Sequence, residues 1–142
     1  MANKIIETLT IGGTSFDMHS AEHYGDTKNI TLPTASTAVK CISHTIQGAG
    51  IYIFKGFVGF GAGSTTGETY RYLYFKSDNI ITISAAFRDA SSGAAGKEIV
   101  DCLKITDDNP REISLWCSCS KPVTTNMQVT LNIIKVVDIK AS

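Results

Sequence analysis

The sequence lacks an excess of charge of either sign, because 13 lysine and arginine residues balance 13 aspartate and glutamate residues in a chain of 142. Proteins that bind nucleic acid by electrostatics carry a basic surface, so this partner is not favoured. No apolar run approaches the roughly 20 residues that span a bilayer, so membrane insertion is not expected. The start, Met1–Thr10, lacks the apolar core of a signal peptide, which favours assembly in a cytoplasm.

The four cysteines show none of the spacings of zinc ribbons or CxxC redox motifs. Cys117 and Cys119 are two residues apart, so on a strand they share a face with Leu115 and are expected to act as small core residues. His19 and His23 are four residues apart, but no third ligand accompanies them and nearby glycines oppose a helix. No metal site is predicted.

No catalytic signature is visible. The three histidines lie far in sequence from anything that resembles a nucleophile motif, and no cofactor-binding motif is present. The sequence therefore predicts a protein that is not an enzyme and holds no cofactor. A glycan hydrolase stays an alternative through its scattered carboxylates, whose separations in space the sequence does not reveal. These are Glu68, Asp78, Asp89, Glu98, Asp101, Asp107 and Asp108.

What the chain does contain is a succession of β-branched and aromatic runs bounded by Gly, Ser, Asp, Asn or Pro. Eight strands are predicted, at Lys4–Ile11, Ala38–Ile46, Gly50–Phe60, Thr69–Lys76, Ile80–Arg88, Glu98–Thr106, Glu112–Ser118 and Met127–Ile139. Eight strands suit an all-β fold, an antiparallel jelly-roll β-sandwich. Because residues 12–33 are small, polar and irregular, residues 1–33 are predicted to form an irregular N-terminal arm and residues 34–142 the jelly-roll head.

The stretch Ile51–Phe60 is apolar on both of its alternating faces. An antiparallel sandwich normally buries one face of each sheet, so the second face needs another cover. The simplest cover is another copy of the same chain. Candidate residues for an interface between copies are Tyr52, Phe54, Val58, Phe60 and Trp116.

A row of tyrosines on Tyr70–Phe75 is the sharpest surface candidate, because alternate residues of a strand share a face. Such a row can stack on sugar rings or seal a subunit interface. Packing in an interface or a core is the commoner role, and tyrosine suits both settings. The candidate residues for binding a receptor or glycan are Tyr70, Tyr72, Tyr74, Ser91 and Ser92.

Four segments taken in order resemble a known domain: Gly48–Phe60, Tyr70–Leu73, Ile113–Trp116 and Val129–Val137. The pattern is similar to the jelly roll shared by tumour necrosis factor and the globular head of complement's first component, in the versions found on bacteriophage fibres. The likeness covers residues 38–139. One departure is the pair Glu68 and Thr69, which stands where the family often has glycine directly before Tyr-Arg.

The segment Ile6–Phe16 also resembles the start of many phage structural proteins from gut bacteria. Together these resemblances imply a homotrimer without catalytic activity, a fibre or head-decoration protein of the virion. The arm would then join other virion proteins, and the head would bind a glycan or protein on the bacterial surface. The alternative is a carbohydrate-binding β-sandwich module of bacterial or viral origin, monomeric, with its tyrosine face on glycans.

Overall fold

The computed structural model describes residues 8–11, 14–17, 22–60, 69–89 and 95–139. The regular secondary structure of these residues consists of β-strands alone. The strands are β1 (Thr8–Ile11), β2 (Thr14–Asp17), β3 (Glu22–Leu32), β4 (Val39–Ile46), β5 (Gly50–Phe60), β6 (Thr69–Ser77), β7 (Ile80–Asp89), β8 (Ala95–Ile105), β9 (Arg111–Cys119) and β10 (Val123–Ile139). In this part of the chain, no helix is long and apolar enough to cross a membrane.

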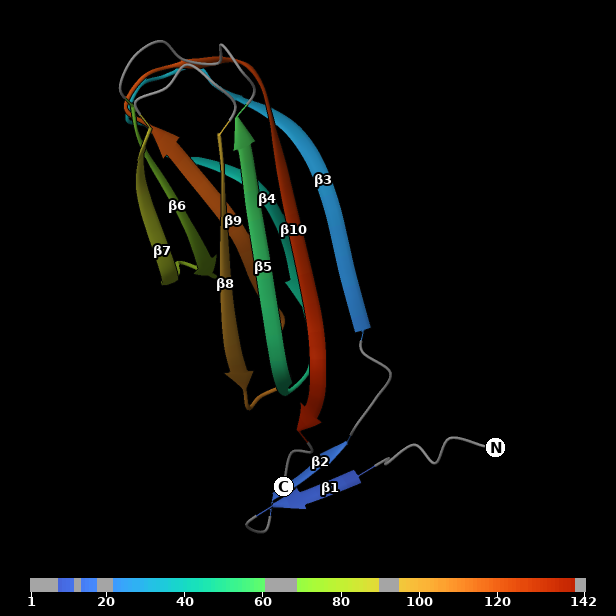
Figure 1. The fold of residues 1–142 in the computed structure, drawn as a ribbon. Coiled ribbons are helices and arrows are strands. Elements are labelled where there is room, and N and C mark those ends of the chain that lie inside the picture. Colours follow the sequence, from blue (N-terminus) through green and yellow to red (C-terminus); the bar gives the residue numbers. More distant parts are fainter. Residues whose placement is uncertain (1–7, 12–13, 18–21, 61–68, 90–94, 140–142) are drawn as a thin grey trace.

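The strands form two antiparallel sheets (Figure 1), one ordered β3-β10-β5-β8 and the other β4-β9-β6-β7. The hairpin of β1 and β2 joins the first sheet at the end of β10. If β3 to β10 are numbered one to eight, the sheets read one-eight-three-six and two-seven-four-five, which is the strand order of a jelly roll. The predicted all-β antiparallel sandwich is confirmed.

The strands predicted after residue 34 are all present, and β5 has the predicted bounds. The largest difference is in β10, which begins at Val123 rather than Met127. Of the strand predicted over Lys4–Ile11, Thr8–Ile11 forms β1, and residues 1–7 lie outside the described residues.

The prediction of an irregular arm up to residue 33 needs correction. The segment Glu22–Leu32 is strand β3, which pairs with β10 from Leu32 opposite Val123 to Glu22 opposite Lys135. Leu32 is fully buried in the core. The segment's polar residues favour a loop by propensity, but pairing along a long neighbouring strand satisfies its backbone and overrides that preference.

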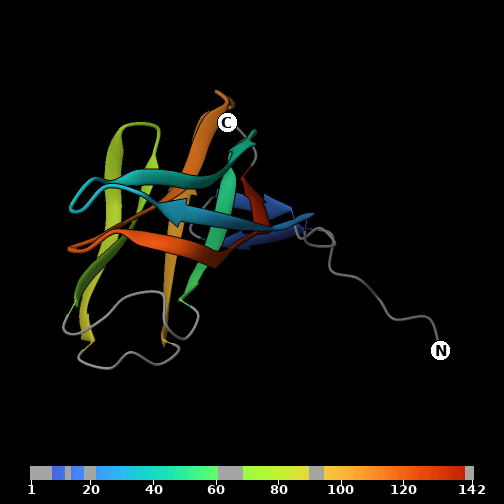
Figure 2. The same cartoon turned by 90° about the horizontal axis from the view of Figure 1, so that it is seen from above.

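The core lies between the two sheets, whose strands enclose a common interior in the view from above (Figure 2). The even-numbered apolar residues of β5 point into it, and Phe54 packs edge to face on Phe75 of β6 with ring centroids 6.0 Å apart. Within a single chain Phe54 and Val58 are fully buried. The buried apolar side chains of β5 are those of Tyr52, Phe54, Val58 and Phe60.

This burial corrects the assignment of those four residues to an interface between copies. Their side chains contact the chain's own second sheet and present no surface to a partner. The opposite face of β5, with Ile51, Ile53 and Phe57, is the one left partly exposed. Alternation along a strand shows that two faces exist, but the identity of the inner face depends on where the second sheet packs.

At Gly56 the two sheets approach each other closely. A Cβ atom at this position would lie 2.8 Å from Cζ of Phe75 and 3.0 Å from a methyl carbon of Leu115. Both neighbours are fully buried, so neither side chain has room to move away. The glycine is required here by packing.

We expect Gly56→Ala to destabilise the fold by about 1–3 kcal/mol, because the added methyl group overpacks the core. Chemical denaturation followed by tryptophan fluorescence measures the change in the free energy of unfolding. Lys55→Ala, at the exposed neighbouring position, is the control and should change stability by less than about 0.5 kcal/mol. An alanine at residue 56 that stabilises the protein would contradict this packing.

Candidate functional site

The outer face of sheet β4-β9-β6-β7 carries the tyrosine row. Along β6, Arg71, Leu73 and Phe75 are buried, and the residues between them point outward. Tyr70 is 47% exposed and Tyr72 is 50% exposed. The predicted alternation of this strand is confirmed, and its tyrosines lie on the surface rather than in the core.

The neighbouring strands place small side chains on both sides of Tyr72 and on one side of Tyr74. Tyr72 stands opposite Ser118 of β9 and Ala86 of β7. Tyr74 stands opposite Ser84 on β7. Because directly opposed residues share a face, the tyrosine rings rise above short neighbours and form a ridge.

Trp116 of β9 completes this surface, since it stands opposite Tyr74 in the register. The two ring planes are 8° from parallel and their centroids are 6.2 Å apart. The indole Nε1 donates a hydrogen bond to Oγ of Ser114 at 2.9 Å, which orients the ring. Nζ of Lys76 lies 4.4 Å from the indole centroid, and Nζ of Lys40 lies 5.9 Å from it. Both distances are those of cation–π contacts.

We call this set the aromatic face: Tyr70, Tyr72, Tyr74, Trp116, Lys40 and Lys76. Lys40 also forms an ion pair with Glu112, 2.7 Å between Nζ and Oε1. Burial raises the pKa of the Tyr74 hydroxyl, and the nearby thiols of Cys117 and Cys41 raise it further. Tyr74 is therefore an uncharged phenol at neutral pH, able to stack and to form hydrogen bonds.

Two predicted binding residues, Ser91 and Ser92, lie outside the described residues. Trp116, predicted at an interface between copies, shares a surface with the predicted glycan-binding tyrosines instead. Sequence reasoning missed Lys40 and Lys76 as members of this surface. The alternation of Lys76 with Phe75 could have placed it on the face of Tyr74, whereas Lys40 lies on β4, where the pairing with β9 sets it opposite Trp116.

A cavity of about 370 Å³ opens where β3 and β4 lie near each other at the border of the two sheets. Its lining residues are Tyr24, His44, Thr45, Ile46, Gln47, Tyr52, Ile133 and Lys135. His44 is partly buried and stacks on Tyr24 with ring centroids 3.5 Å apart.

Two polar groups of this cavity, the Tyr52 hydroxyl and the Lys135 ammonium, already have partners within the chain. The Tyr52 hydroxyl lies 2.8 Å from the carbonyl oxygens of both Gln47 and Gly48 and donates toward them. Lys135 forms an ion pair with Asp138. Burial alone would lower the pKa of Lys135, but the contacts with Asp138 and Tyr52 outweigh it and the pKa is raised. The lysine is thus charged and already neutralised, which leaves little attraction for an anion.

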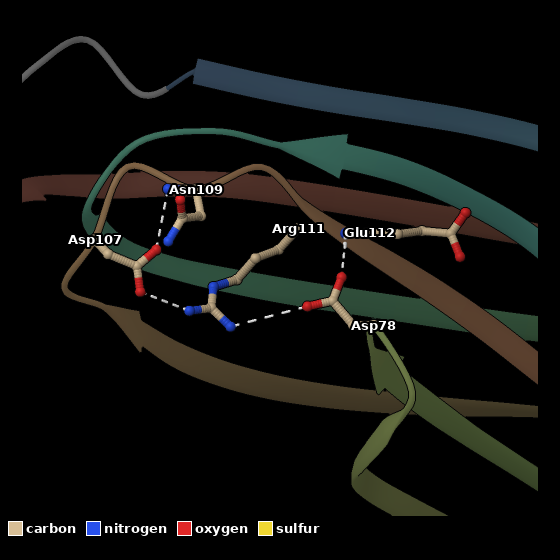
Figure 3. A network of polar contacts seen from close by, with 5 residues as sticks. All are labelled: Asp78, Asp107, Asn109, Arg111 and Glu112. Atoms are coloured by element: carbon tan, nitrogen blue, oxygen red, sulfur yellow. Dashed lines mark hydrogen bonds and ion pairs between the residues drawn. The ribbon is translucent and has the colours of Figure 1, made fainter.

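A polar network ties the turn between β6 and β7 to the loop before β9, and Figure 3 shows Arg111 between two carboxylates. Its Nη2 donates to Oδ2 of Asp107 at 2.7 Å, and its Nη1 lies 3.9 Å from Oδ2 of Asp78. Oδ1 of Asp78 accepts a hydrogen bond from the backbone N–H of Glu112 at 3.0 Å. The network fastens two connections of the sandwich to each other.

Of the carboxylates kept as candidates for hydrolysis, Glu68 lies outside the described residues, and Asp78, Glu98 and Asp107 form ion pairs. Glu98 pairs with Lys55 at 3.0 Å on sheet β3-β10-β5-β8, whereas Asp78 and Asp107 share Arg111. Among the described residues, no three His, Cys, Asp or Glu side chains lie together as a metal site would require.

The strand order defines this chain as a jelly-roll β-sandwich with an aromatic surface on one sheet. Neither the protein-family models nor the curated proteins contain a match to it. Solved structures with a similar fold come from infectious bursal disease virus. The structure of the virus's Gx strain has a TM-score of 0.55 and 12% identity, and the match covers 84% of this chain and 34% of that one.

Two further structures of the same virus are similar. One is the VP2 subviral particle, with a TM-score of 0.50, 14% identity, and coverage of 84% of this chain and 34% of that chain. The other is a mutant VP2 protein in derived T=1 particles, with a TM-score of 0.53, 12% identity, and coverage of 84% of this chain and 33% of that chain. At such identities the likeness extends to the fold alone. This chain spans about a third of the length of those proteins.

Asp107 gives this structure a testable acid sensitivity. The backbone N–H of Asn109 and the guanidinium of Arg111 hold the pKa of the Asp107 carboxyl below its usual 3.8. A lowered folded-state pKa stabilises the fold above about pH 4, and this stabilisation is lost as the pH falls through the folded-state pKa.

Asp107→Asn should therefore lower the Tm at pH 7 by roughly 1–3 °C, because the ion pair is partly exposed. The difference from the unsubstituted protein should shrink as the pH falls below 3.8. Thermal unfolding followed by circular dichroism between pH 7 and pH 2 measures both quantities. A difference in Tm of constant size across this range would contradict the assigned role.

Proposed function

We propose that this protein is a structural protein of a bacteriophage virion, a fibre or head-decoration protein that forms a homotrimer and attaches to the host surface. It assembles in the host cytoplasm and acts in the virion, without catalysis. The jelly-roll strand order supports this role, as does the fold similarity to proteins of virus particles. The observation that carries the proposal is a group of partly exposed apolar side chains on the outer face of one sheet, where they lie among polar residues such as Lys55 and Glu98 and the described residues leave them uncovered.

That uncovered surface, the assembly face, is the outer side of sheet β3-β10-β5-β8. On it Ile53 of β5 stands opposite Ile134 of β10, and both are partly exposed. Val100 of β8 is 48% exposed beside Lys55. Burying such residues against another copy removes apolar area from water. The apolar members of the assembly face are Ile51, Ile53, Phe57, Val100 and Ile134.

A trimer closed on the assembly face would turn the aromatic face away from the threefold axis, because the two faces belong to opposite sheets. Three aromatic faces on one trimer, and several trimers on one particle, would multiply a weak contact into firm attachment. The hairpin of β1 and β2 lies beyond the sandwich at the end of β10 (Figure 1), a position suited to joining another virion protein.

The second candidate is a monomeric carbohydrate-binding module. The half-exposed ring of Tyr72 favours it, because a free aromatic ring on a sheet surface suits stacking on a sugar. The two candidates differ in assembly and in gene context. Genes for portal, capsid or tail proteins beside this one would support the virion role, and a polysaccharide-utilisation cluster would favour the module.

Sedimentation equilibrium tests the assembly. We expect a species of three times the 15.3 kDa chain mass. Ile53→Lys should give a monomer, because it places a charge in the centre of the assembly face. Ala86→Lys, on the opposite sheet, is the matched control and should leave the trimer intact. An unsubstituted protein that stays monomeric at working concentration would overturn the trimer.

A further inference from the structure

We propose that the aromatic face binds an acidic polysaccharide whose chain lies along β6. The inference rests on the attachment role proposed above and names the chemical class of the receptor. The ligand is identified by three features of the surface: the spacing of exposed rings, the short hydroxylated side chains beside them, and the sign of the surrounding charge.

The rings follow one line. Alternate residues of a strand are about 6.6–6.8 Å apart, so Tyr70, Tyr72 and Tyr74 form a row of that period. Tyr70 and Tyr72 are about half exposed in the free chain. A repeating row of ring faces matches an extended polymer of flat, partly apolar units, and a sugar ring presents such a C–H face to an aromatic ring.

The floor beside the rings suits hydroxyl groups. Ser118 stands beside Tyr72 on β9, and Ser84 stands beside Tyr74 on β7. Each serine offers a donor and an acceptor next to a ring, and Ala86 leaves space on the other side of Tyr72. A globular protein partner would need protruding side chains to fill the space above these short residues, whereas a thin polymer chain fits beside the tyrosine rings.

The charge favours an anion. Lys76, Lys40 and Arg88 lie on this face, since Arg88 stands opposite Tyr70. Among the described residues, the acidic side chain in contact with these cations is Glu112, which forms an ion pair with Lys40. The recorded contacts of Lys76 are with the rings of Trp116 and Tyr74, so its ammonium retains hydrogen-bonding capacity for a carboxylate on the sugar.

Single-stranded nucleic acid also stacks on aromatic residues, but its affinity depends on many phosphate contacts. This chain has no net charge, and its aromatic face presents few cations. A polysaccharide with widely spaced carboxylates is the better match.

The experiment measures binding of the assembled protein to polygalacturonate and to fully methyl-esterified polygalacturonate by affinity electrophoresis and calorimetry. The two probes share a backbone, and the ester masks the carboxylates. We expect the acid form to bind at least roughly fivefold more tightly, because it adds an ion pair to the stacking. Oligothymidylate should bind no better than the ester.

Two variants separate stacking from charge. Tyr72→Ala should weaken binding of both probes roughly fivefold by removing a stacking ring. Lys76→Gln should weaken binding of the acid form alone. Lys28→Gln, an exposed lysine on β3 in the other sheet, makes the same change in charge and should leave binding unchanged. Circular dichroism and sedimentation check that each variant folds and assembles.

Equal affinity for acid and ester, or an unchanged affinity in Lys76→Gln, would overturn the acidic ligand. Tighter binding of oligothymidylate would overturn the polysaccharide in favour of nucleic acid. A trimer that binds neither polysaccharide overturns this inference and leaves the assembly proposal standing. A monomer that binds the acid form with the expected variant pattern supports the inference and overturns the trimer.

Discussion

Strand β10 pairs along both of its edges, and the rest of the fold depends on this arrangement. On one edge it holds β3 over Glu22–Leu32, and on the other it holds β5 over Gly50–Phe60. Its far end also receives β2. One long strand thus joins the start, middle and end of the chain into one sheet. The second sheet packs against this sheet, and the core lies between them.

The two sheets present outer surfaces of different chemistry on opposite sides of a shared core. The inner side of β5 is filled by aromatic and branched residues that pack on the second sheet so closely that Gly56 has no room for a side chain. On the outer side of the same sheet, Ile53 of β5 and Ile134 of β10 are partly exposed. On the outer side of the other sheet, the side chains of Tyr72 and Trp116 point outward. The proposed assembly and the proposed attachment would therefore use different sheets and would not compete for the same residues.

Much of the fold could be predicted because strand signals are local. β5 was predicted with its observed bounds, since a run that is apolar on both faces begins at Gly50 and stops before Gly61 in the sequence. β3 was missed because Gly25, Asp26 and Asn29 have low strand propensity, and the partner that stabilises them is about 100 residues away in the chain. No local pattern records such a distant pairing.

The candidate site divides in the same way. The sequence by itself determined that Tyr70, Tyr72 and Tyr74 share a face, because side-chain direction alternates along any strand. Tertiary structure alone decided that this face lies outside, that Trp116 stands opposite Tyr74, and that Phe54 points into the chain's own core. Alternation is a property of one strand, whereas burial and cross-strand neighbours are set by which strands pair and which sheet faces pack together.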